Sequence, residues 1–187
     1  MSTLINQLIT DHKNLTRLLN ILDDQVKAFM LNSNDEENDF SVLLETLDYL
    51  NAYPQKWHHP AEDLILNFLL EKDLNKEDKD SIKTILKQHQ VLEKETKKLE
   101  ELFLSITNDA IIPMRRISEQ FFSYLDLQRE HIETENHLVF PIMEQNITES
   151  EWQSLQGKLS NTLKDPLFQT RIKSEYNILY RYLDNSN

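Results

Sequence analysis

The sequence predicts an all-α protein: an antiparallel, up-down four-helix bundle with one or two additional short C-terminal helices. Three observations support this fold class. Apolar residues recur at helical spacing through four segments of about 30 residues each. Short polar segments join these four, as in bundles whose neighbouring helices run antiparallel. The chain of 187 residues contains one glycine, which argues against glycine-rich nucleotide-binding loops and tight hairpins.

The first half of the bundle is expected to contain two helices. The first covers residues 2–31, where leucines and other apolar residues recur at helical spacing. Residues 32–38 are polar and typical of a loop. The second helix is expected from residue 39 to about residue 70, and Pro54 and Pro60 within it predict a kink or a break.

The second half of the bundle has the same organisation. Residues 73–78 predict a loop and a helix start, and the third helix then continues to about residue 107. Residues 108–113 predict a turn. The fourth helix is expected at about residues 114–144, with Pro141 near its end.

The segment after the bundle predicts two shorter helices. Thr148 and Glu151 form a capping box that opens the first of them, which contains the single glycine, Gly157. Asp165 followed by a proline is typical of a helix start, so a last helix is expected from there to about Tyr182. The expected domains are the bundle, residues 1–146, and a C-terminal helical extension packed on it, residues 147–187.

Charge and missing residue types exclude several classes of function. Acidic residues number 32 and basic residues 20, and the net charge of −12 argues against binding to nucleic acids or anionic membranes. The absence of cysteine excludes disulfides, zinc–thiolate sites and cysteine-ligated clusters. No apolar run is long enough to span a membrane, and the first eleven residues do not resemble a secretory signal. We therefore expect a cytoplasmic protein.

Histidines and glutamates form a pattern that occurs once in each half of the bundle. In each half, one helix carries a single histidine, and the next carries a histidine followed four residues later by a glutamate. Residues four apart share one face of a helix. The pattern comprises His12, His58 and Glu62 in the first half and His89, His131 and Glu135 in the second.

The same six residues are expected at one level of the bundle. A helix rises about 1.5 Å per residue, and counting along each helix and back along its neighbour returns to the same height. Imidazole and carboxylate ligands suit divalent iron, manganese or zinc, and six ligands exceed the four of one zinc ion. Two ions, each held by two histidines and bridged by both glutamates, would use all six. Room would then remain for a bridging oxide or hydroxide and an exogenous ligand.

A simpler interpretation is that these are ordinary surface or core residues. A lone histidine on a helix is usually an ordinary surface or core residue. A His–Glu pair four residues apart is often only a surface ion pair. Two such pairs and two further histidines at matching depth favour a metal centre. His59 and His137 fall outside the pattern, and we expect them beside the ligands or at the surface. The internal repeat favours His58 over His59, because Glu62 then aligns with Glu135.

Two other residues are candidates for positions beside the ligands. Glu93 lies four residues after His89, where it could add a ligand or support one. Tyr124 lies seven residues before His131 on the same helix face, so it either lines the cavity or belongs to the apolar core.

The sequence resembles the hemerythrin-like, HHE cation-binding family. The similar segments are Asp11–Leu15, Trp57–Asp63, His89, and His131–Glu135 continuing through Phe140 and Pro141; Asp165–Phe168 is similar to a subgroup of bacterial members. The resemblance implies a four-helix bundle that holds a non-haem di-iron centre. It implies as metal ligands His12, His58, Glu62, His89, His131 and Glu135.

Two departures from better-known members narrow the expected function. Oxygen-carrying hemerythrins have a histidine where this chain has Glu93 and an aspartate where it has Glu135, which argues against reversible oxygen carriage. Many members that repair iron–sulfur clusters have an N-terminal segment with a cysteine, and this chain has no cysteine.

The leading hypothesis is a metal-binding protein, rather than an enzyme, with two oxo- or hydroxo-bridged iron ions. It would bind or sense oxygen, peroxide or nitric oxide, so its partner would be a small diatomic molecule or a peroxide. Manganese and zinc are alternative metals. The alternative functions are iron donation to damaged iron–sulfur clusters and a helical interaction module with a structural metal.

Overall fold

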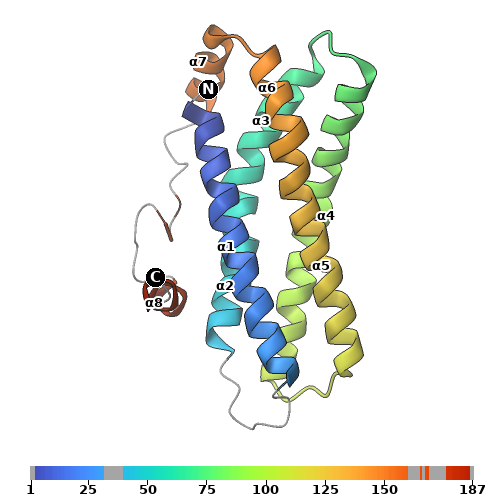
Figure 1. Cartoon of the computed structure of the whole chain (residues 1–187), viewed down its shortest axis with the longest axis vertical. Helices are drawn as coiled ribbons and strands as arrows, with labels where there is room; N and C mark the ends of the chain where they lie inside the picture. Colours follow the sequence, from blue (N-terminus) through green and yellow to red (C-terminus); the bar gives the residue numbers. More distant parts are fainter. Residues whose placement is uncertain (1–2, 32–39, 160–164, 166, 169–175, 186–187) are drawn as a thin grey trace.

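The computed structural model describes residues 3–31, 40–159, 165, 167–168 and 176–185, and these residues contain helices and no strand. Four long helical segments lie side by side and run in alternating directions (Figure 1). They are α1 (Thr3–Leu31), α2–η1–α3 (Ser41–Tyr53, Pro54–His58, His59–Leu70), α4 (Lys76–Thr107) and α5–η2–α6 (Met114–Thr134, Glu135–Val139, Phe140–Asn146). The predicted all-α bundle is confirmed.

Two of these segments pass through a π-helical turn, η1 and η2. Each turn lies just before a proline, Pro60 or Pro141, which lacks an N–H and clashes with the carbonyl four residues earlier. The N–H of His59 bonds to the carbonyl of Pro54, five residues back, and Phe140 bonds to Glu135 in the same way. The distortion predicted in the second helix as a kink or a break takes the form of a π turn, and the segment remains helical through it.

Among the described residues, two short helices follow the bundle, as predicted. The first is α7 (Glu149–Lys158), which begins with the expected capping box, where Thr148 N–H donates to Glu151 Oε2 at 2.8 Å. The second is α8 (Asn177–Asn185). The predicted start of this helix at Asp165 is wrong, because Leu167 and Phe168 form a turn, and residues 166 and 169–175 of the predicted helix lie outside the described residues. The end lies within a few residues of the predicted Tyr182. Asp165 Oδ1 accepts the N–H groups of the two described residues after it in a turn, and Tyr176 forms a bend before α8.

The apolar core is divided into two parts, which we call the upper and lower cores. The upper core lies near α3, α6 and α7, and the lower core lies near α2, the first half of α5 and α8. Along α1, Leu8 belongs to the upper core and Leu15 to the lower one, and the buried polar residues Asp11 and His12 lie between them. The polar residues that matter for function therefore form a layer through the middle of the bundle.

None of the described helices combines the length and the apolar character needed to cross a lipid bilayer.

Candidate metal centre

All six predicted ligands meet in one buried layer of the bundle, which we call the histidine layer. Their side chains are between 0% and 4% exposed, far less than ionisable residues on a helix normally are. The residues come from all four long helical segments, and His59 lies with them. The structure therefore brings together the residues that the internal repeat predicts to share one level.

The two π turns help to place these side chains. His58 is the last residue of η1, His59 is the first of α3, and Glu135 is the first of η2. A π turn contains one residue more than an α-helical turn, so successive side chains are rotated by a smaller angle about the helix axis. His58 and His59 can consequently both point into the bundle although they are adjacent in sequence.

One set of donor atoms, the first donor group, consists of His12, His58, Glu62 and Glu135. The Nε2 atom of His12 lies 3.1 Å from Nε2 of His58 and 3.2 Å from Oε2 of Glu135. The Nε2 atom of His58 lies 3.4 Å from Oε2 of Glu62. Two atoms bound to one ion at about 2.1 Å lie roughly 3.0–3.4 Å apart, so this spacing suits a shared ion.

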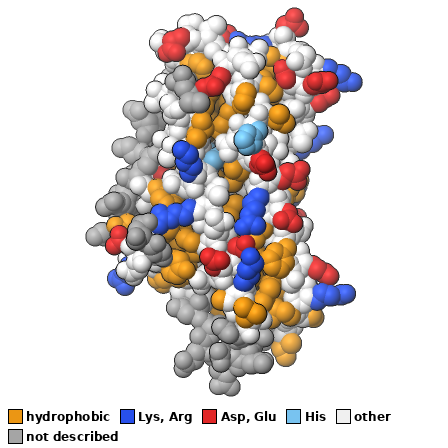
Figure 2. Space-filling view, viewed as in Figure 1, with side chains coloured by type: hydrophobic (Ala, Val, Ile, Leu, Met, Phe, Trp, Pro, Cys, Tyr) orange, Lys and Arg blue, Asp and Glu red, His pale blue; other side chains and the backbone are white. Residues whose placement is uncertain are grey.

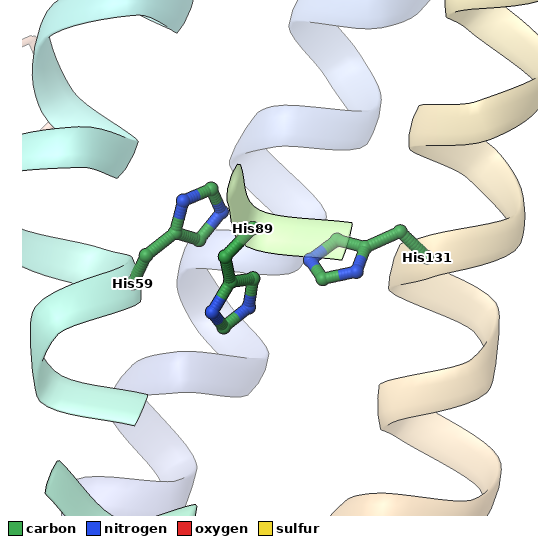
Figure 3. A group of neighbouring side chains, drawn as sticks. All are labelled: His59, His89 and His131. Carbon is green, nitrogen blue, oxygen red and sulfur yellow. The ribbon is translucent and has the colours of Figure 1, made fainter. Parts of the chain in front are cut away.

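A second donor group consists of His59, His89 and His131, which come from α3, α4 and α5 and converge from three sides (Figure 3). The rings of His59 and His89 are stacked at 4.1 Å and 11°, so one of the two rings must turn before both can direct a lone pair at one ion. The ring of His131 lies nearly perpendicular to both. Sequence reasoning placed His59 outside the ligand set, whereas the structure buries it within this group.

The two glutamates lie between the two donor groups. Glu135 Oε2 is 3.2 Å from Nε2 of both His12 and His131, and its Oε1 is 3.2 Å from Nε2 of His89. Glu62 Oε2 is 3.4 Å from Nε2 of His58 and 3.5 Å from Nε2 of His89. Each carboxylate thus reaches histidines of both groups, which is the position that a bridging ligand requires.

The opposite ring nitrogen, Nδ1, faces a side-chain oxygen in four of these histidines. Such contacts fix the ring orientation of a metal ligand and leave Nε2 with its lone pair. Each partner is the sequence neighbour of a predicted ligand on another helical segment, so the sequence carried a signal for it. The pairs are His12–Asn136 (2.9 Å), His58–Asp11 (3.2 Å), His89–Asp63 (2.7 Å) and His131–Gln88 (3.1 Å).

The two buried glutamates have opposite pKa shifts. Burial, followed by the charge of Glu135, raises the pKa of Glu62 well above its usual value. Burial alone would also raise the pKa of Glu135, but His131, His12 and His89 hold it well below its usual value. In the absence of a cation, the layer therefore favours one charged glutamate over two.

The histidines are mostly held neutral. Burial lowers the pKa of His131 to about 4 and lowers the pKa values of His58 and His59 as well. His89 differs, because its bonds to Asp63 and Glu135 outweigh burial and raise its pKa to about 9. Neutral imidazoles are the form that binds metal ions.

Several buried polar atoms of the layer have no hydrogen-bond partner, and they are Nδ1 of His59, Nε2 of His131, both oxygens of Glu62 and Oε2 of Glu135. Burying such atoms without a partner costs free energy. The unpaired atoms belong to both donor groups, and a cation would satisfy the lone pairs among them. The residues of the layer therefore fit bound metal ions.

The other three candidates lie outside the layer. Glu93 is exposed on α4, so its expected place beside the ligands is wrong. Tyr124 belongs to the lower core, where its hydroxyl contacts Thr96 at 3.1 Å and Gln128 at 2.9 Å. His137 is exposed, in agreement with the surface position expected for it.

A pocket of about 440 Å³ adjoins the layer at His12. Lys13 and Thr16 of α1 and Asn136 of η2 line it, together with Ile9. On the face drawn in Figure 2, which α1 and α5 occupy, histidine atoms reach the surface among acidic and basic side chains. The pocket gives a small molecule an approach to the first donor group.

Comparison with known proteins gives one finding. The family model described as the hemerythrin HHE cation binding domain matches residues 3–143, which include every residue of both donor groups. No curated protein and no solved structure gives a significant match.

Proposed function

This chain belongs to the hemerythrin HHE cation-binding family, and on that basis we propose that the histidine layer binds two iron ions. The protein then binds or senses oxygen, peroxide or nitric oxide at these ions. The first ion is held by His12 and His58 and the second by His59, His89 and His131. The two glutamates bridge the ions.

The observation that carries this proposal is the contact between His12 and His58. Their Nε2 atoms lie 3.1 Å apart while each Nδ1 faces an oxygen acceptor. If both Nδ1 atoms carry protons, two lone pairs point at each other beside two carboxylates. This arrangement is unfavourable unless a proton or a metal ion lies between them. Burial lowers the pKa of His58 and so disfavours the proton, whereas imidazole and carboxylate are both ligands of divalent metal ions.

A count of donors indicates where an exogenous ligand binds. With both glutamates bridging, the ion at His59, His89 and His131 receives one imidazole more than the ion at His12 and His58. The ion with two histidines is the one with a free coordination position. The pocket beside His12 lies on the same side, so a small molecule reaches this ion from there. Bound iron supplies redox chemistry and a Lewis acid, and the protein orients its ligands and excludes bulk water.

Metal analysis of the purified protein tests this proposal. Reconstitution with iron should give two irons per chain, and air oxidation should produce the near-ultraviolet absorption of an oxo-bridged ferric pair. Azide, a small anion used as a probe, should change this absorption. One iron per chain, or a centre that takes zinc and rejects iron, would contradict the di-iron proposal. Slow loss of iron to a mild chelator supports sensing over iron donation.

A further inference from the structure

The C-terminal extension packs on the helical segments that lead to the first donor group. The backbone N–H of Leu179 in α8 donates to Oε2 of Glu45 in α2 at 2.7 Å. Arg17 of α1 donates from Nη2 to the carbonyl oxygen of Leu183 at 3.1 Å. Leu179 and Leu183 are both buried in the lower core. These contacts fix α8 against α1 and α2 (Figure 1).

Tyr49 of α2 is another residue at which the extension meets the bundle. Its side chain is fully buried, and its ring stacks on that of Tyr53 at 5.4 Å and 19°. From the extension, Tyr176 lies edge-on to Tyr49 at 5.3 Å and Phe168 at 6.3 Å. The packing around the two stacked tyrosines therefore depends on the docked extension.

Tyr53 is connected to the first donor group through Asp11. Its hydroxyl donates to Oδ2 of Asp11 at 3.1 Å, and the same oxygen lies 3.2 Å from Nδ1 of His58. All three side chains are at most 2% exposed. Because water does not screen these groups, a change of charge at His58 alters the electrostatic field at Asp11 and Tyr53.

The extension also places a buried carboxylate near this chain of contacts. Asp165 is fully buried, and its Oδ1 accepts the N–H groups of Leu167 and Phe168. Burial and then the charge of Asp165 raise the pKa of the Tyr49 hydroxyl. Burial also raises the pKa of Asp165, and the charge of Asp11 adds to this shift. After burial, the charges of Asp11 and Asp165 both raise the pKa values of Tyr49 and Tyr53, so each carboxylate lies near the stacked pair and the two charges repel each other.

We propose that docking of the C-terminal extension is coupled to cation binding at the first donor group, so that the extension reports the state of the centre. This inference deepens the proposed function and rests on it. When Nε2 of His58 binds a cation, its Nδ1–H becomes a stronger donor to Asp11. Asp11 then repels Asp165 less, and the docked extension is stabilised.

Coupling of this kind acts in both directions. If metal binding stabilises the docked extension, then the docked extension raises the affinity for metal by the same factor. The matched family domain ends at residue 143, so the coupling joins the family's domain to a segment outside it. In a sensor, a segment whose docking depends on the metal transmits the state of the metal centre to other molecules.

Hydrogen exchange of the full chain, followed by mass spectrometry, tests the coupling. The amides of Asn177–Asn185 are compared in metal-free protein and in protein loaded with iron(II) without oxygen. Loading should slow their exchange by between about 5-fold and about 150-fold, the usual range for two coupled sites. Asp165→Asn keeps an oxygen that can accept the N–H groups of Leu167 and Phe168 and removes the charge that Asp11 repels, so this ratio should fall close to one. Asp184→Asn, which removes an exposed carboxylate of the same extension, should match the wild type.

A second measurement starts from the extension and follows metal binding, and it keeps the test valid if Asp165→Asn folds poorly. Tyr176→Ala removes an extension residue that contacts Tyr49, and it should weaken iron(II) binding by a similar factor in a chelator competition. Wild-type protein with two irons whose α8 amides exchange at the metal-free rate would overturn the coupling and leave the proposed function intact. Wild-type protein that binds no iron would overturn both.

Discussion

The two halves of the bundle carry the same pattern of histidine and glutamate with different neighbours. In residues 3–70 the neighbours of the pattern are carboxylates, Asp11 and Asp63. In residues 76–146 the corresponding positions hold the amides Gln88 and Asn136. In the folded bundle the two carboxylates are divided between the two donor groups, because Asp11 bonds to a histidine of the first group and Asp63 to a histidine of the second. An asymmetric sequence thus gives each proposed ion one imidazole backed by a carboxylate and one backed by an amide.

The two glutamates differ in the direction of their pKa shifts, and the contacts between the segments do not remove this difference. Burial and Glu135 raise the pKa of Glu62, whereas the surrounding histidines lower the pKa of Glu135. Equivalent positions in a repeated pattern therefore differ in how readily they lose a proton before metal binds. Substitutions in matched pairs can establish how far the halves are equivalent.

The largest effect is expected when either glutamate is removed. Glu62→Ala and Glu135→Ala should each lower iron content well below one per chain, because each carboxylate contacts histidines of both donor groups. Metal analysis after reconstitution measures this. Retention of one full iron by either variant would show that this glutamate serves a single ion.

The next largest effect is expected for His59, the one histidine of the donor groups that lies outside the repeated pattern. His59→Ala should lower iron content from two towards one per chain, because it removes one of three imidazoles in the second donor group. His137→Ala is the matched control, since His137 is exposed, and it should keep both irons. Equal iron content in the two variants would restrict His59 to packing against His89.

A smaller effect is expected from the carboxylate partner in the second donor group. Asp63→Asn should lower iron affinity by about tenfold or somewhat more, because a neutral partner polarises the His89 ring less. Competition against a chelator of known affinity gives the number. An unchanged affinity would mean that an amide and a carboxylate are equivalent at this position.

The smallest effect on iron affinity is expected when an amide partner is replaced by a carboxylate. Gln88→Glu gives His131 a carboxylate partner and should raise iron affinity by less than about tenfold. The same competition measures it. A loss of affinity would indicate that burying the added charge costs more free energy than the stronger polarisation of the His131 ring contributes to metal binding.

Much of this arrangement follows from helical periodicity. Apolar spacing predicts α1 and α4 within a few residues, and the rise per residue predicts that His12, His58, His89 and His131 meet in one layer. These predictions succeed because they depend on distances along a helix, which a single π turn changes little.

Orientation around the helix axis is where the sequence analysis was least successful. The exclusion of His59 from the pattern rested on the alignment of Glu62 with Glu135, and that alignment did not show that η1 lets the adjacent His58 and His59 both point into the bundle. Pro54 and Pro60 signalled a distortion but did not specify which kind. The start of α8 was also misplaced, because the contacts made by Asp165 close a turn as readily as they start a helix.

The four Nδ1 contacts also fix how the helical segments can slide past one another. They join α1 to η2, α5 to α4, α4 to α3 and η1 to α1, a closed circuit around the bundle axis. Leucine-rich surfaces alone tolerate a shift of one helical turn, about 5.4 Å, with modest loss of packing. Such a shift of any one segment would separate polar pairs that are now within 3.2 Å, so the layer specifies a single vertical register for the whole bundle.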